Sequence, residues 1–498
     1  MSHVNTREDW AQAAKRLKIA AGLFIDGALV NAQSGRTMDC INPATGDVIA
    51  EVALGEAGDM DAAVASAQAA WKDGRWRKLA PRQRMDIMFK WANLIEQHAN
   101  ELALLETLDM GKPISDVLNI DLPEVLRALR FFAECIDKME GAVTHTSPTA
   151  LHLITHEPLG VVGAITPWNY PMLMAMWKLA PVLAAGNCVV LKPSEQAPLS
   201  CTRLAQLFVQ AGGPPGVFNL VNGTGAQAGQ ALALHPDVAK ITFTGSTAVG
   251  KLLMGYAGQS NMKRVALETG GKSPQIFMPD LYDLDAAVER AVGGIYDNAG
   301  QVCNAGSRLL VHQSLHDEFV HRFIQRAKSM YACGDPLDPR TTLGPLASRA
   351  HQHGVLKRIA QARAEGAVQV LGEAEHASGT GSFVSPVLFV GASNTMAIVK
   401  EEVFGPVATV QSFDTEAQAL ALANDSIYGL AASVWTSDLQ TAHRMTAALE
   451  AGVVWVNCFG DGDMTQPFGG FKQSGQSRDK HINSLLSYMQ IKSAWLNL

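Results

Sequence analysis

Cys303 is the residue of this sequence best suited to covalent chemistry. It lies in the segment GQVCNAGSR (residues 300–308), and of its two adjoining residues only Val302 is apolar. A free cysteine ordinarily packs as a small buried hydrophobe, but here glycines and polar residues surround the thiol and would let a ligand approach the backbone. We interpret Cys303 as a nucleophile, with a structural core thiol as the alternative.

Two further segments carry side chains that could assist such a thiol. In ITPWNYP (165–171), Asn169 lies between an indole and a phenol, and its amide could donate a hydrogen bond to an oxyanion. In VALETGGKSP (265–274), Glu268 ends a strand pattern and precedes two glycines, so its carboxylate could act as a base. Taken singly, a turn asparagine and a surface glutamate are the commoner interpretations.

A glycine-bounded turn supplies a candidate phosphate site. KITFTGSTAVGK (240–251) is typical of a strand, a turn at Gly245 and a helix start, which would direct backbone N–H groups at a phosphate. It resembles a P-loop, but Leu252 stands where that motif has the Ser or Thr that binds magnesium, so a dinucleotide pyrophosphate fits better. GTGAQAG (223–229) is a weaker glycine motif.

The segment LKPSEQAP (191–198) follows an apolar strand pattern, so Lys192 and Glu195 should emerge at the carboxyl edge of a sheet. Doubly wound sheets bind ligands at that edge. A glutamate there can accept hydrogen bonds from both ribose hydroxyls of adenosine and would repel a 2′-phosphate, which favours NAD over NADP. A solvated loop pair is the alternative.

The histidines do not predict a metal centre. His312 and His316 have i, i+4 spacing, and His351 and His353 are close in sequence, but no carboxylate or thiol completes a set of ligands. We expect these four side chains to be solvated and the protein to bind no metal.

Alternating strands and helices must position these residues. Between about 158 and 270, short β-branched runs ending in Gly or Pro alternate with Ala- and Leu-rich stretches, which predicts a doubly wound α/β unit with a parallel sheet. VALETGGKSPQIF (265–277) continues this alternation, with a strand that ends at Glu268. A second α/β domain is predicted after Cys303. Its strands would be 307–313, 407–413 and 431–437, and its helices would be about 315–332 and a stretch that ends at Ala423.

Two segments instead alternate polar and apolar residues with a period of two. They are THTSPTALHLITHEP (144–158) and LLSYMQIKSAWLNL (485–498), and neither has an evident sheet of its own. Strands of this kind are often completed by pairing across subunits, so we expect an oligomer.

Length and composition exclude several classes of protein. The chain has 498 residues, 47% hydrophobic, and a net charge of −7, which indicates a globular protein of about three domain-sized units and not a nucleic-acid binder. Seven cysteines without a C-x-x-C pair favour a reducing compartment. The charged N-terminus lacks a signal-peptide pattern, and prolines and Lys178 interrupt the most apolar region (160–193), so we expect a cytoplasmic protein that binds no membrane.

The order of these motifs identifies a family resemblance. From about Leu23 to its C-terminus the chain is similar to NAD(P)-dependent aldehyde dehydrogenases, on the ordered segments ITPWNYP, LKPSE, FTGSTAVG, LETGGKSP, GQVCNAGSR, EEVFGPV (401–407) and PFGGFKQSG (467–475). The resemblance implies an α/β aldehyde dehydrogenase fold and a homodimer or homotetramer. Its parts would be a Rossmann-like NAD-binding domain (1–138 and 158–270), an α/β catalytic domain (271–475) and a small β oligomerisation flap (139–157 and 476–498).

The resemblance also implies roles for residues. Cys303 would be the nucleophile that forms a thiohemiacetal and then a thioester, Glu268 the base that activates water, and Asn169 with the Cys303 backbone N–H the oxyanion hole. Because a free thiol is only a few per cent ionised at neutral pH, the site must favour the thiolate, for example through the cationic nicotinamide. NAD would be bound by Ile165, Thr166, Pro167, Trp168, Lys192, Ser194, Glu195, Gly225, Phe243, Gly245, Ser246, Glu402 and Phe404.

Within the family, the segments at 102–113 and 461–488 resemble bacterial enzymes that oxidise γ-glutamylaminobutyraldehyde, guanidinobutyraldehyde and related ω-aminoaldehydes of polyamine degradation. Ser477 departs from the usual SG-x-GR pattern, and Thr269 departs from many members. The alternatives are a broad-specificity or betaine-type aldehyde dehydrogenase, a CoA-acylating dehydrogenase, against which Glu268 argues, and an inactive structural relative.

The resemblance places the small-molecule aldehyde in a tunnel bounded on one side by Asp121, Tyr170 and Trp177. The other side would be the 458–464 loop, which contains the two remaining predicted substrate-binding residues, Asp461 and Asp463. Carboxylates beside aromatic rings predict a substrate with a cationic or polar tail. Solvated loop aspartates are the alternative.

Overall fold

The first sheet confirms the doubly wound unit predicted between 158 and 270. The structure, a computed structural model, describes residues 6–372 and 380–498. The first sheet has the order β11-β10-β7-β8-β9-β1-β2, and its strands from β11 to β9 are parallel. The chain runs outward from β7 through β8 and β9 and then returns to place β10 on the other side of β7, which creates a switch point. The strands are β1 (Leu23–Ile25), β2 (Ala28–Val30), β7 (Val161–Ile165), β8 (Cys188–Lys192), β9 (Phe218–Leu220), β10 (Lys240–Thr244) and β11 (Arg264–Glu268).

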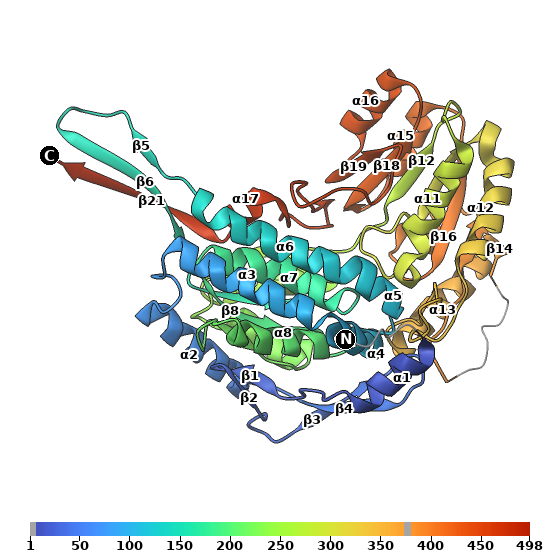
Figure 1. Cartoon of the computed structure of the whole chain (residues 1–498). Coiled ribbons are helices and arrows are strands. Elements are labelled where there is room, and N and C mark those ends of the chain that lie inside the picture. Colours follow the sequence, from blue (N-terminus) through green and yellow to red (C-terminus); the bar gives the residue numbers. More distant parts are fainter. Residues whose placement is uncertain (1–5, 373–379) are drawn as a thin grey trace.

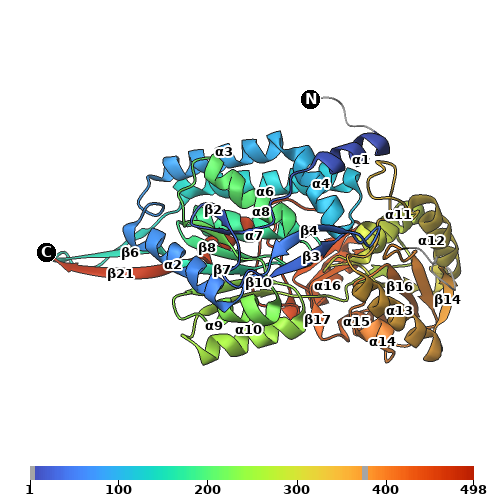
Figure 2. The same ribbon diagram turned by 90° about the horizontal axis from the view of Figure 1, so that it is seen from below.

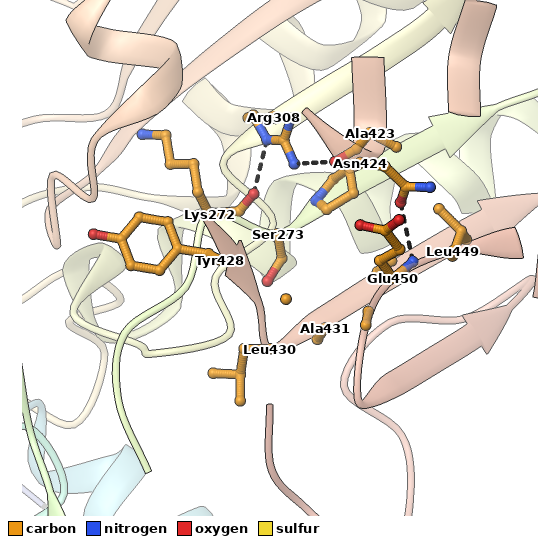
Figure 3. Close-up of a pocket in the computed structure, with 14 residues that line it drawn as sticks. Lys272, Ser273, Arg308, Ala423, Asn424, Tyr428, Leu430, Ala431, Leu449 and Glu450 are labelled. Carbon is orange, nitrogen blue, oxygen red and sulfur yellow. Dashed lines mark hydrogen bonds between the residues drawn. The ribbon is translucent and has the colours of Figure 1, made fainter. Parts of the chain in front are cut away.

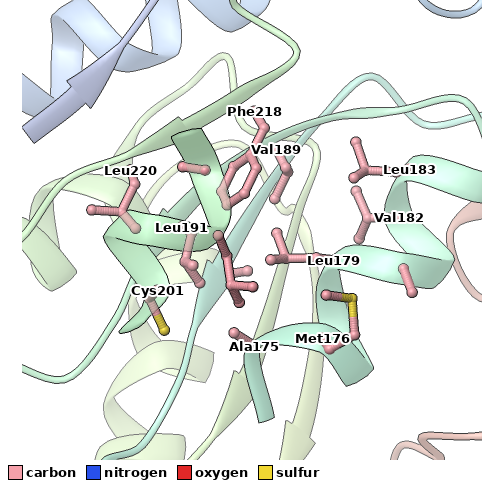
Figure 4. Packing of buried hydrophobic residues seen from close by; sticks show 14 of the residues in the cluster. Ala175, Met176, Leu179, Val182, Leu183, Val189, Leu191, Cys201, Phe218 and Leu220 are labelled. Atoms are coloured by element: carbon pink, nitrogen blue, oxygen red, sulfur yellow. The ribbon is translucent and has the colours of Figure 1, made fainter. Parts of the chain in front are cut away.

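The core of this sheet fixes the strand ends that carry the candidate site. Strands β7, β8 and β10 are buried along their whole length because helices cover both faces, which is why they consist of near-continuous apolar runs. Val189 and Leu191 of β8 pack in one cluster with Phe218 of β9. Figure 4 shows this cluster beside Leu179 and Val182 of helix α7 (Pro171–Ala184).

A second sheet confirms the α/β domain predicted after Cys303. Its order is β14-β15-β16-β13-β12-β18-β19, and all neighbours except β14 and β15 are parallel. Figure 2 shows the two bodies side by side, each with its strands between covering helices. The strands are β12 (Pro274–Phe277), β13 (Arg308–His312), β14 (Val368–Leu371), β15 (Val387–Val390), β16 (Val407–Phe413), β18 (Ala431–Trp435) and β19 (Val453–Val456).

The strand end predicted at Glu268 is confirmed, and the segment 265–277 contains two strands. The segment contains β11, which belongs to the first sheet, and β12, which belongs to the second. Five residues, Thr269 to Ser273, separate the strands, and the chain crosses from one body to the other at this point. Glu268 therefore lies at the junction of the two bodies.

The two segments with period-two patterns pair with each other. Strand β21 (Met489–Asn497) runs antiparallel to β6 (Ala150–Pro158), with Met489 opposite Pro158 and Asn497 opposite Ala150. With β5 (Ala142–Thr144) they form a three-stranded sheet that extends away from the first body (Figure 1). The expectation that they lack a sheet of their own is therefore wrong. The division into three domains at the predicted boundaries stays a prediction.

Helices cover both large sheets, and the remaining strands form two small antiparallel pairs. Among the described residues, no helix is long and apolar enough to cross a membrane. The helices are α1 (Arg7–Arg16), α2 (Ala57–Asp73), α3 (Pro81–Gln97), α4 (Ala99–Met110), α5 (Ile114–Asp116), α6 (Leu122–Cys135), α7, α8 (Leu199–Gln210), α9 (Gln230–Leu234), α10 (Thr247–Gln259), α11 (Leu284–Tyr296), α12 (His316–Met330), α13 (Arg349–Ala364), α14 (Ala397–Lys400), α15 (Glu416–Asn424), α16 (Leu439–Ala448) and α17 (His481–Leu486). Shorter helical turns are η1 (Val117–Asp121), η2 (Ile136–Lys138), η3 (Gly225–Gly229), η4 (Asp297–Gly300) and η5 (Gln313–Leu315), and the small strand pairs are β3 (Thr37–Ile41) with β4 (Val48–Ala53) and β17 (Tyr428–Gly429) with β20 (Phe471–Lys472).

Candidate active site

Cys303 follows a strained turn between α11 and β13. Asn298, Ala299 and Gly300 have φ values of 50°, 55° and 70°, three consecutive residues in the left-handed region. Glycine is required at 300 by close approach, because a Cβ there would lie 2.2 Å from the carbonyl oxygen of Gly405. Backbone strain of this kind persists only where the surrounding structure enforces it, and it is typical of functional sites.

Side-chain hydrogen bonds stabilise this turn. Asn298 Nδ2 donates to the carbonyl oxygen of Asn169 at 3.0 Å, and Gln301 Nε2 donates to the carbonyl oxygen of Asn298 at 3.0 Å. The N–H of Ala347 donates to Gln301 Oε1 at 2.9 Å. Asn298 and Gln301 were not predicted from sequence, where the only signal was that asparagine tolerates the left-handed region.

Asn169 lies beside the thiol. Its Nδ2 donates to the carbonyl oxygen of Gln301 at 2.8 Å, and Asn169 and Cys303 line the same cavity. A carboxamide has two N–H donors, so the second remains available to that cavity among the described residues. This geometry permits the oxyanion contact expected of Asn169.

The cavity beside Cys303 has a volume of about 230 Å³ and lies where the two bodies meet. The carboxyl ends of β7 and β10 form one wall, on either side of the switch point where doubly wound sheets bind ligands. The second body supplies the other wall, and Cys303 is partly exposed where the two walls meet. The cavity is lined by Pro167, Trp168, Asn169, Met174, Thr244, Gly245, Ser246, Thr269, Gly270, Cys303, Glu402 and Phe404.

Lys192 and Glu195 form an ion pair at the end of β8. Lys192 Nζ lies 2.8 Å from Glu195 Oε2, and the side chains are 4% and 40% exposed. Burial raises the pKa of Glu195, but the charge and hydrogen bond of Lys192 and the N–H of Gly225 bring it below its ordinary value. Ser194 in the same loop accepts a hydrogen bond from the Gln196 N–H. The Glu195 carboxylate is thus ionised and accessible.

The glycine-bounded turn brings a helix N-terminus to the cavity. Ser246 is the N-cap of α10, and its Oγ accepts a hydrogen bond from the Val249 N–H at 3.3 Å. A Cβ at Gly245 would lie 2.4 Å from the ring of Phe243, so the ring and the turn can be this close only with glycine. The arrangement is that predicted for a phosphate site.

Two buried hydroxyl groups beside this cavity have no hydrogen-bond partner among the described residues. They are Thr166 Oγ1, which follows Ile165 at the end of β7, and Thr244 Oγ1, at the end of β10. Buried polar atoms are normally satisfied, so these two mark a place for a polar ligand. The residues present therefore fit the predicted dinucleotide.

Glu402 and Phe404 reach the cavity from the loop before β16. Glu402 Oε1 accepts a hydrogen bond from the Gly271 N–H at 3.1 Å, and burial raises the pKa of this carboxyl to about 7. His351 Nε2 lies 2.7 Å from the carbonyl oxygen of Phe404, and burial lowers the pKa of the imidazole. The expectation that His351 is solvated is therefore wrong, because it supports Phe404 at a φ of 58°.

Two further cavities adjoin the Cys303 turn. The larger, of about 500 Å³, is lined by Val302 and Asn304, the neighbours of Cys303 in sequence. Tyr170, Asp297 and Met330 line both cavities. The smaller, of about 310 Å³, is lined by Lys112, Asp116, Ile120, Asp121, Tyr170, Asp297, Asn298, Met330, Tyr331 and Thr342. The larger is completed by Glu289, Arg290, Gly293, Gly294, Phe459 and Gly460.

Of the predicted substrate-binding residues, Tyr170 and Asp121 line these cavities. Asp121 is almost completely buried and forms an ion pair with Lys112, and the Lys112 ammonium lies 3.4 Å from the centre of the Tyr170 ring. Its charge is neutralised inside the protein, so Asp121 does not offer the free carboxylate that was predicted from the sequence. That pairing could not be predicted from sequence spacing.

The other three predicted residues do not line either cavity. Trp177 packs edge-on against Phe468 at 5.2 Å between ring centres. The carboxylate of Asp463 accepts hydrogen bonds from the backbone N–H and hydroxyl of Thr465, which fixes its own loop. Asp461 Oδ1 lies 3.7 Å from Arg290 Nη1, and Arg290 lines the larger cavity. Of these three residues, Asp461 is therefore the one that pairs with a residue of a cavity wall.

Asp116 and Asp297 of the smaller cavity and Glu289 of the larger cavity were not predicted from sequence, and Glu289 forms an ion pair with Arg326. Burial raises the pKa of Asp116 to about 7, and burial also raises the pKa of Asp297. The hydroxyl of Tyr331 donates a hydrogen bond to Asp297. Asp116 ends α5 and Asp297 begins the strained turn, and no motif in either segment signals that they share a cavity.

Comparison with known proteins decides the family. The aldehyde dehydrogenase family matches residues 29–494. The chain belongs to this family. It is 47% identical over 489 residues, 98% of each chain, to the NADP/NAD-dependent aldehyde dehydrogenase PuuC of Escherichia coli (strain K12). It is 45% identical over 498 residues, 100% of each chain, to an aminoacetaldehyde dehydrogenase of Pseudomonas aeruginosa.

A solved structure confirms the predicted fold and cofactor. An indole-3-acetaldehyde dehydrogenase in complex with NAD⁺ superposes with a TM-score of 0.98 and 50% identity, covering 99% of this chain and 100% of that one. The protein is an NAD-dependent aldehyde dehydrogenase with an α/β aldehyde dehydrogenase fold.

In this aldehyde dehydrogenase, the described residues around Cys303 favour the neutral thiol over the thiolate. Burial and then repulsion from Glu402 and Glu268 raise the pKa of the thiol to about 12, against hydrogen bonds from the N–H groups of Asn304 and Cys303. The expectation that the site favours thiolate is therefore not met by the described residues alone. A cation bound in the adjoining cavity would lower this pKa.

Glu268 ends β11 in a buried cluster of charged groups. Its Oε1 accepts a hydrogen bond from Ser477 Oγ at 2.7 Å. Burial and then repulsion from Asp479 raise the pKa of this carboxyl well above its ordinary value, and Lys178 opposes the shift. Lys178 and Asp479 are themselves a buried ion pair with an N–O distance of 2.5 Å.

In the aldehyde dehydrogenase, the buried side chain of Arg308 holds the loop between β11 and β12 in place. Arg308 is 2% exposed, and its Nε donates to the carbonyl oxygen of Lys272 at 2.7 Å (Figure 3). Its other nitrogens donate to the carbonyl oxygens of Leu422 and Ala423, each at 2.8 Å. The cavity drawn in Figure 3, of about 10 Å³, belongs to this structural anchor, because it contains neither the thiol nor the Glu268 carboxyl.

Proposed function

We propose that this enzyme oxidises ω-amino, guanidino or γ-glutamylamino butyraldehydes to carboxylic acids, with Cys303 as the nucleophile. The position of Cys303 carries the proposal. The thiol lines the cavity that fits NAD, while its neighbours Val302 and Asn304 line an acid-containing cavity. An aldehyde bound across this junction brings its carbonyl carbon to the sulfur and leaves its tail among the carboxylates.

The first half of the reaction is covalent. The Cys303 thiolate attacks the aldehyde carbon, which forms a C–S bond and a thiohemiacetal oxyanion. The available N–H of the Asn169 amide and the Cys303 backbone N–H stabilise that oxyanion. When bound, NAD accepts the hydride that the carbon releases, and a thioester remains on Cys303.

The second half is hydrolysis, with Glu268 as the base. Glu268 takes a proton from the water that adds to the thioester carbon, the C–S bond breaks, and the carboxylic acid and the Cys303 thiol are released. We therefore predict that Glu268→Gln forms about one equivalent of NADH per site in a burst and then stalls. Stopped-flow measurement of NADH and trapping of the thioester check this, and loss of the burst itself would place Glu268 in the first half-reaction.

Two carboxylates support the proposal of a cationic substrate tail. Asp116 and Asp297 line the smaller cavity, and neither forms an ion pair with a lysine or arginine among the described residues. A guanidinium or ammonium group placed between them would favour their ionised forms and form charge-assisted hydrogen bonds. The rings of Tyr170 and Tyr331 in the same cavity could also contact the cation.

The test of this substrate class uses two aldehydes that differ in charge and not in shape. We expect kcat/KM for 4-guanidinobutyraldehyde to exceed that for 4-ureidobutyraldehyde by about tenfold or more, as charged hydrogen bonds outweigh neutral ones. Equal values would reject the cationic tail. They would then favour a second candidate, an aromatic aldehyde held by Met330 and Phe459, in keeping with the relative named for indole-3-acetaldehyde.

We further infer that Glu195 makes NAD the preferred cofactor. Its ionised, partly exposed carboxylate can accept hydrogen bonds from both ribose hydroxyls and repels a 2′-phosphate. The family does not decide this choice, because the relative from Escherichia coli is named as NADP/NAD-dependent.

We also infer a homodimer or homotetramer. Strand β21 is at the edge of its sheet, so its outer backbone groups can pair with a second copy of the chain. Ile491 and Trp495 on this strand are 70% and 60% exposed, which is unusual for large apolar side chains without a covering partner. The oligomeric state is checked by light scattering during size-exclusion chromatography.

A further inference from the structure

Ser477 occupies the position where the usual family pattern SG-x-GR has glycine, and it contacts the proposed base. Its Oγ lies 2.7 Å from Glu268 Oε1 and 3.0 Å from the carbonyl oxygen of Leu267. A glycine at this position would have no group that could make either contact. The departure therefore adds a hydroxyl group directly to the environment of Glu268.

The hydroxyl proton of Ser477 is directed to Glu268. A serine has one O–H donor, and the two neighbouring oxygens can both accept it. The carbonyl oxygen of Leu267 already accepts the backbone N–H groups of Gln476 at 3.2 Å and Ser477 at 3.4 Å. The Glu268 carboxylate has no donor other than Ser477 at Oε1, and its Oε2 has no partner among the described residues.

The Glu268 carboxyl that Ser477 contacts lies outside the wall of the thiol cavity. That cavity is lined by Thr269, Gly270 and Cys303, and Glu268 is not part of its wall. The Glu268 Oε1 lies behind the wall, where it would be 2.7 Å from a Cβ at Gly469. To accept a proton from water at the thioester, the carboxyl must move from this retracted position into the cavity.

Five charged or titratable groups surround Glu268. Burial and Asp479 oppose ionisation of the carboxyl, while Lys178 and Arg478 favour it. Cys303 on the cavity side and Tyr488 on the opposite side also feel its charge, which raises the pKa of each. The Lys178 charge is shared with Asp479, so the Ser477 hydroxyl is the neutral donor in direct contact with Glu268.

We propose that Ser477 is a positioning residue for the proposed base: its hydroxyl holds the Glu268 carboxylate in the retracted position and favours its ionised form. The inference rests on the proposed role of Glu268 in thioester hydrolysis. Ser477 acts through Glu268 and touches neither the aldehyde nor the cofactor. Its effect must therefore appear in the pH dependence of hydrolysis and not in formation of the thioester.

The test is rapid-quench measurement of thioester decay between about pH 5 and about pH 9, after a single turnover of the full-length enzyme with NAD. We expect Ser477→Ala and Ser477→Gly to raise the apparent pKa of the decay by about one unit, because a hydrogen bond to the ionised form is lost. Ser477→Thr keeps the hydroxyl and should retain the wild-type value. The exposed neighbour Gln476 supplies a matched control, Gln476→Ala, which should also be unchanged.

The amplitude of the NADH burst reports the fraction of folded, active enzyme in each variant. An unchanged apparent pKa in Ser477→Ala, or a Ser477→Thr variant that behaves like alanine, would overturn the inference. A lower maximal rate of thioester decay with an unchanged apparent pKa would indicate only a structural role for Ser477 and would also overturn the inference. If Glu268→Gln leaves thioester decay unaffected, the proposed base itself fails; if Glu268→Gln stalls and Ser477→Ala does not shift the profile, only the Ser477 inference fails.

Discussion

The cavity that fits NAD and the acid-containing cavities beyond Cys303 are built in different ways. Backbone turns at the ends of β7, β10 and β11 supply most of the first, and glycine at 245 keeps its turn close to a ring. Side chains from α5, η1 and the end of α11 supply the second, where ionisable groups pair inside the protein, as Lys112 does with Asp121. Local sequence therefore specifies the cofactor side, whereas tertiary pairing specifies the aldehyde side.

The largest expected effect removes the thiol that both sides share. Cys303→Ala should abolish NADH formation with every aldehyde, because the described residues beside it offer no second nucleophile, while NAD binding remains. Calorimetric titration with NAD and the NADH assay measure the two properties separately. Cys333→Ala, at an exposed cysteine of the second body, is the control that should keep its activity. Substantial turnover by Cys303→Ala would reject covalent catalysis at this residue.

A smaller effect should be confined to the cofactor side. Glu195→Gln removes the charge that would repel a 2′-phosphate, so the preference for NAD over NADP in kcat/KM should fall by about tenfold. The ranking of aldehydes should not change, because Glu195 lies at the end of β8 and lines neither acid-containing cavity. An altered aldehyde ranking would show that the two sides are not independent.

The cofactor side was the more predictable from sequence. Glycine turns after apolar strands placed Gly245, Ser246, Lys192 and Glu195 at one sheet edge because carboxyl ends of parallel strands meet there. The parallel order of both large sheets followed from the same alternation. The pairing of β21 with β6 did not, because a period-two pattern gives no information on which strand it joins.

The aldehyde side could be predicted only in part. Tyr170 was found because it adjoins Asn169 in the ITPWNYP segment. Asp297 was missed because its role depends on a left-handed turn and on Tyr331, neither of which has a sequence signal. Asp121 was found, but its buried ion pair could not be inferred from charge and spacing.

The smallest expected effect is a pH dependence limited to cationic substrates. Asp116 has a pKa of about 7 because of burial, so it is ionised above that pH and loses its charge as the pH falls below it. A guanidinium group stays charged throughout, so the ratio of kcat/KM for the guanidino and ureido aldehydes should fall several-fold between about pH 8 and about pH 6. The ratio cancels changes at Cys303 and Glu268, which affect both substrates. A ratio that stays constant would remove Asp116 from cation binding.

The most direct test of the account is the effect of Asp297→Asn on that same ratio at about pH 8, which is above the pKa of about 7 of Asp116. Asp297 is the carboxylate that lines both cavities, and asparagine keeps its shape while removing its charge. The matched control is Asp461→Asn, because Asp461 is half-exposed beside Arg290 and lines neither cavity. We predict that the preference for 4-guanidinobutyraldehyde falls about tenfold in Asp297→Asn and is unchanged in Asp461→Asn. An equal preference in wild type and Asp297→Asn would contradict the account.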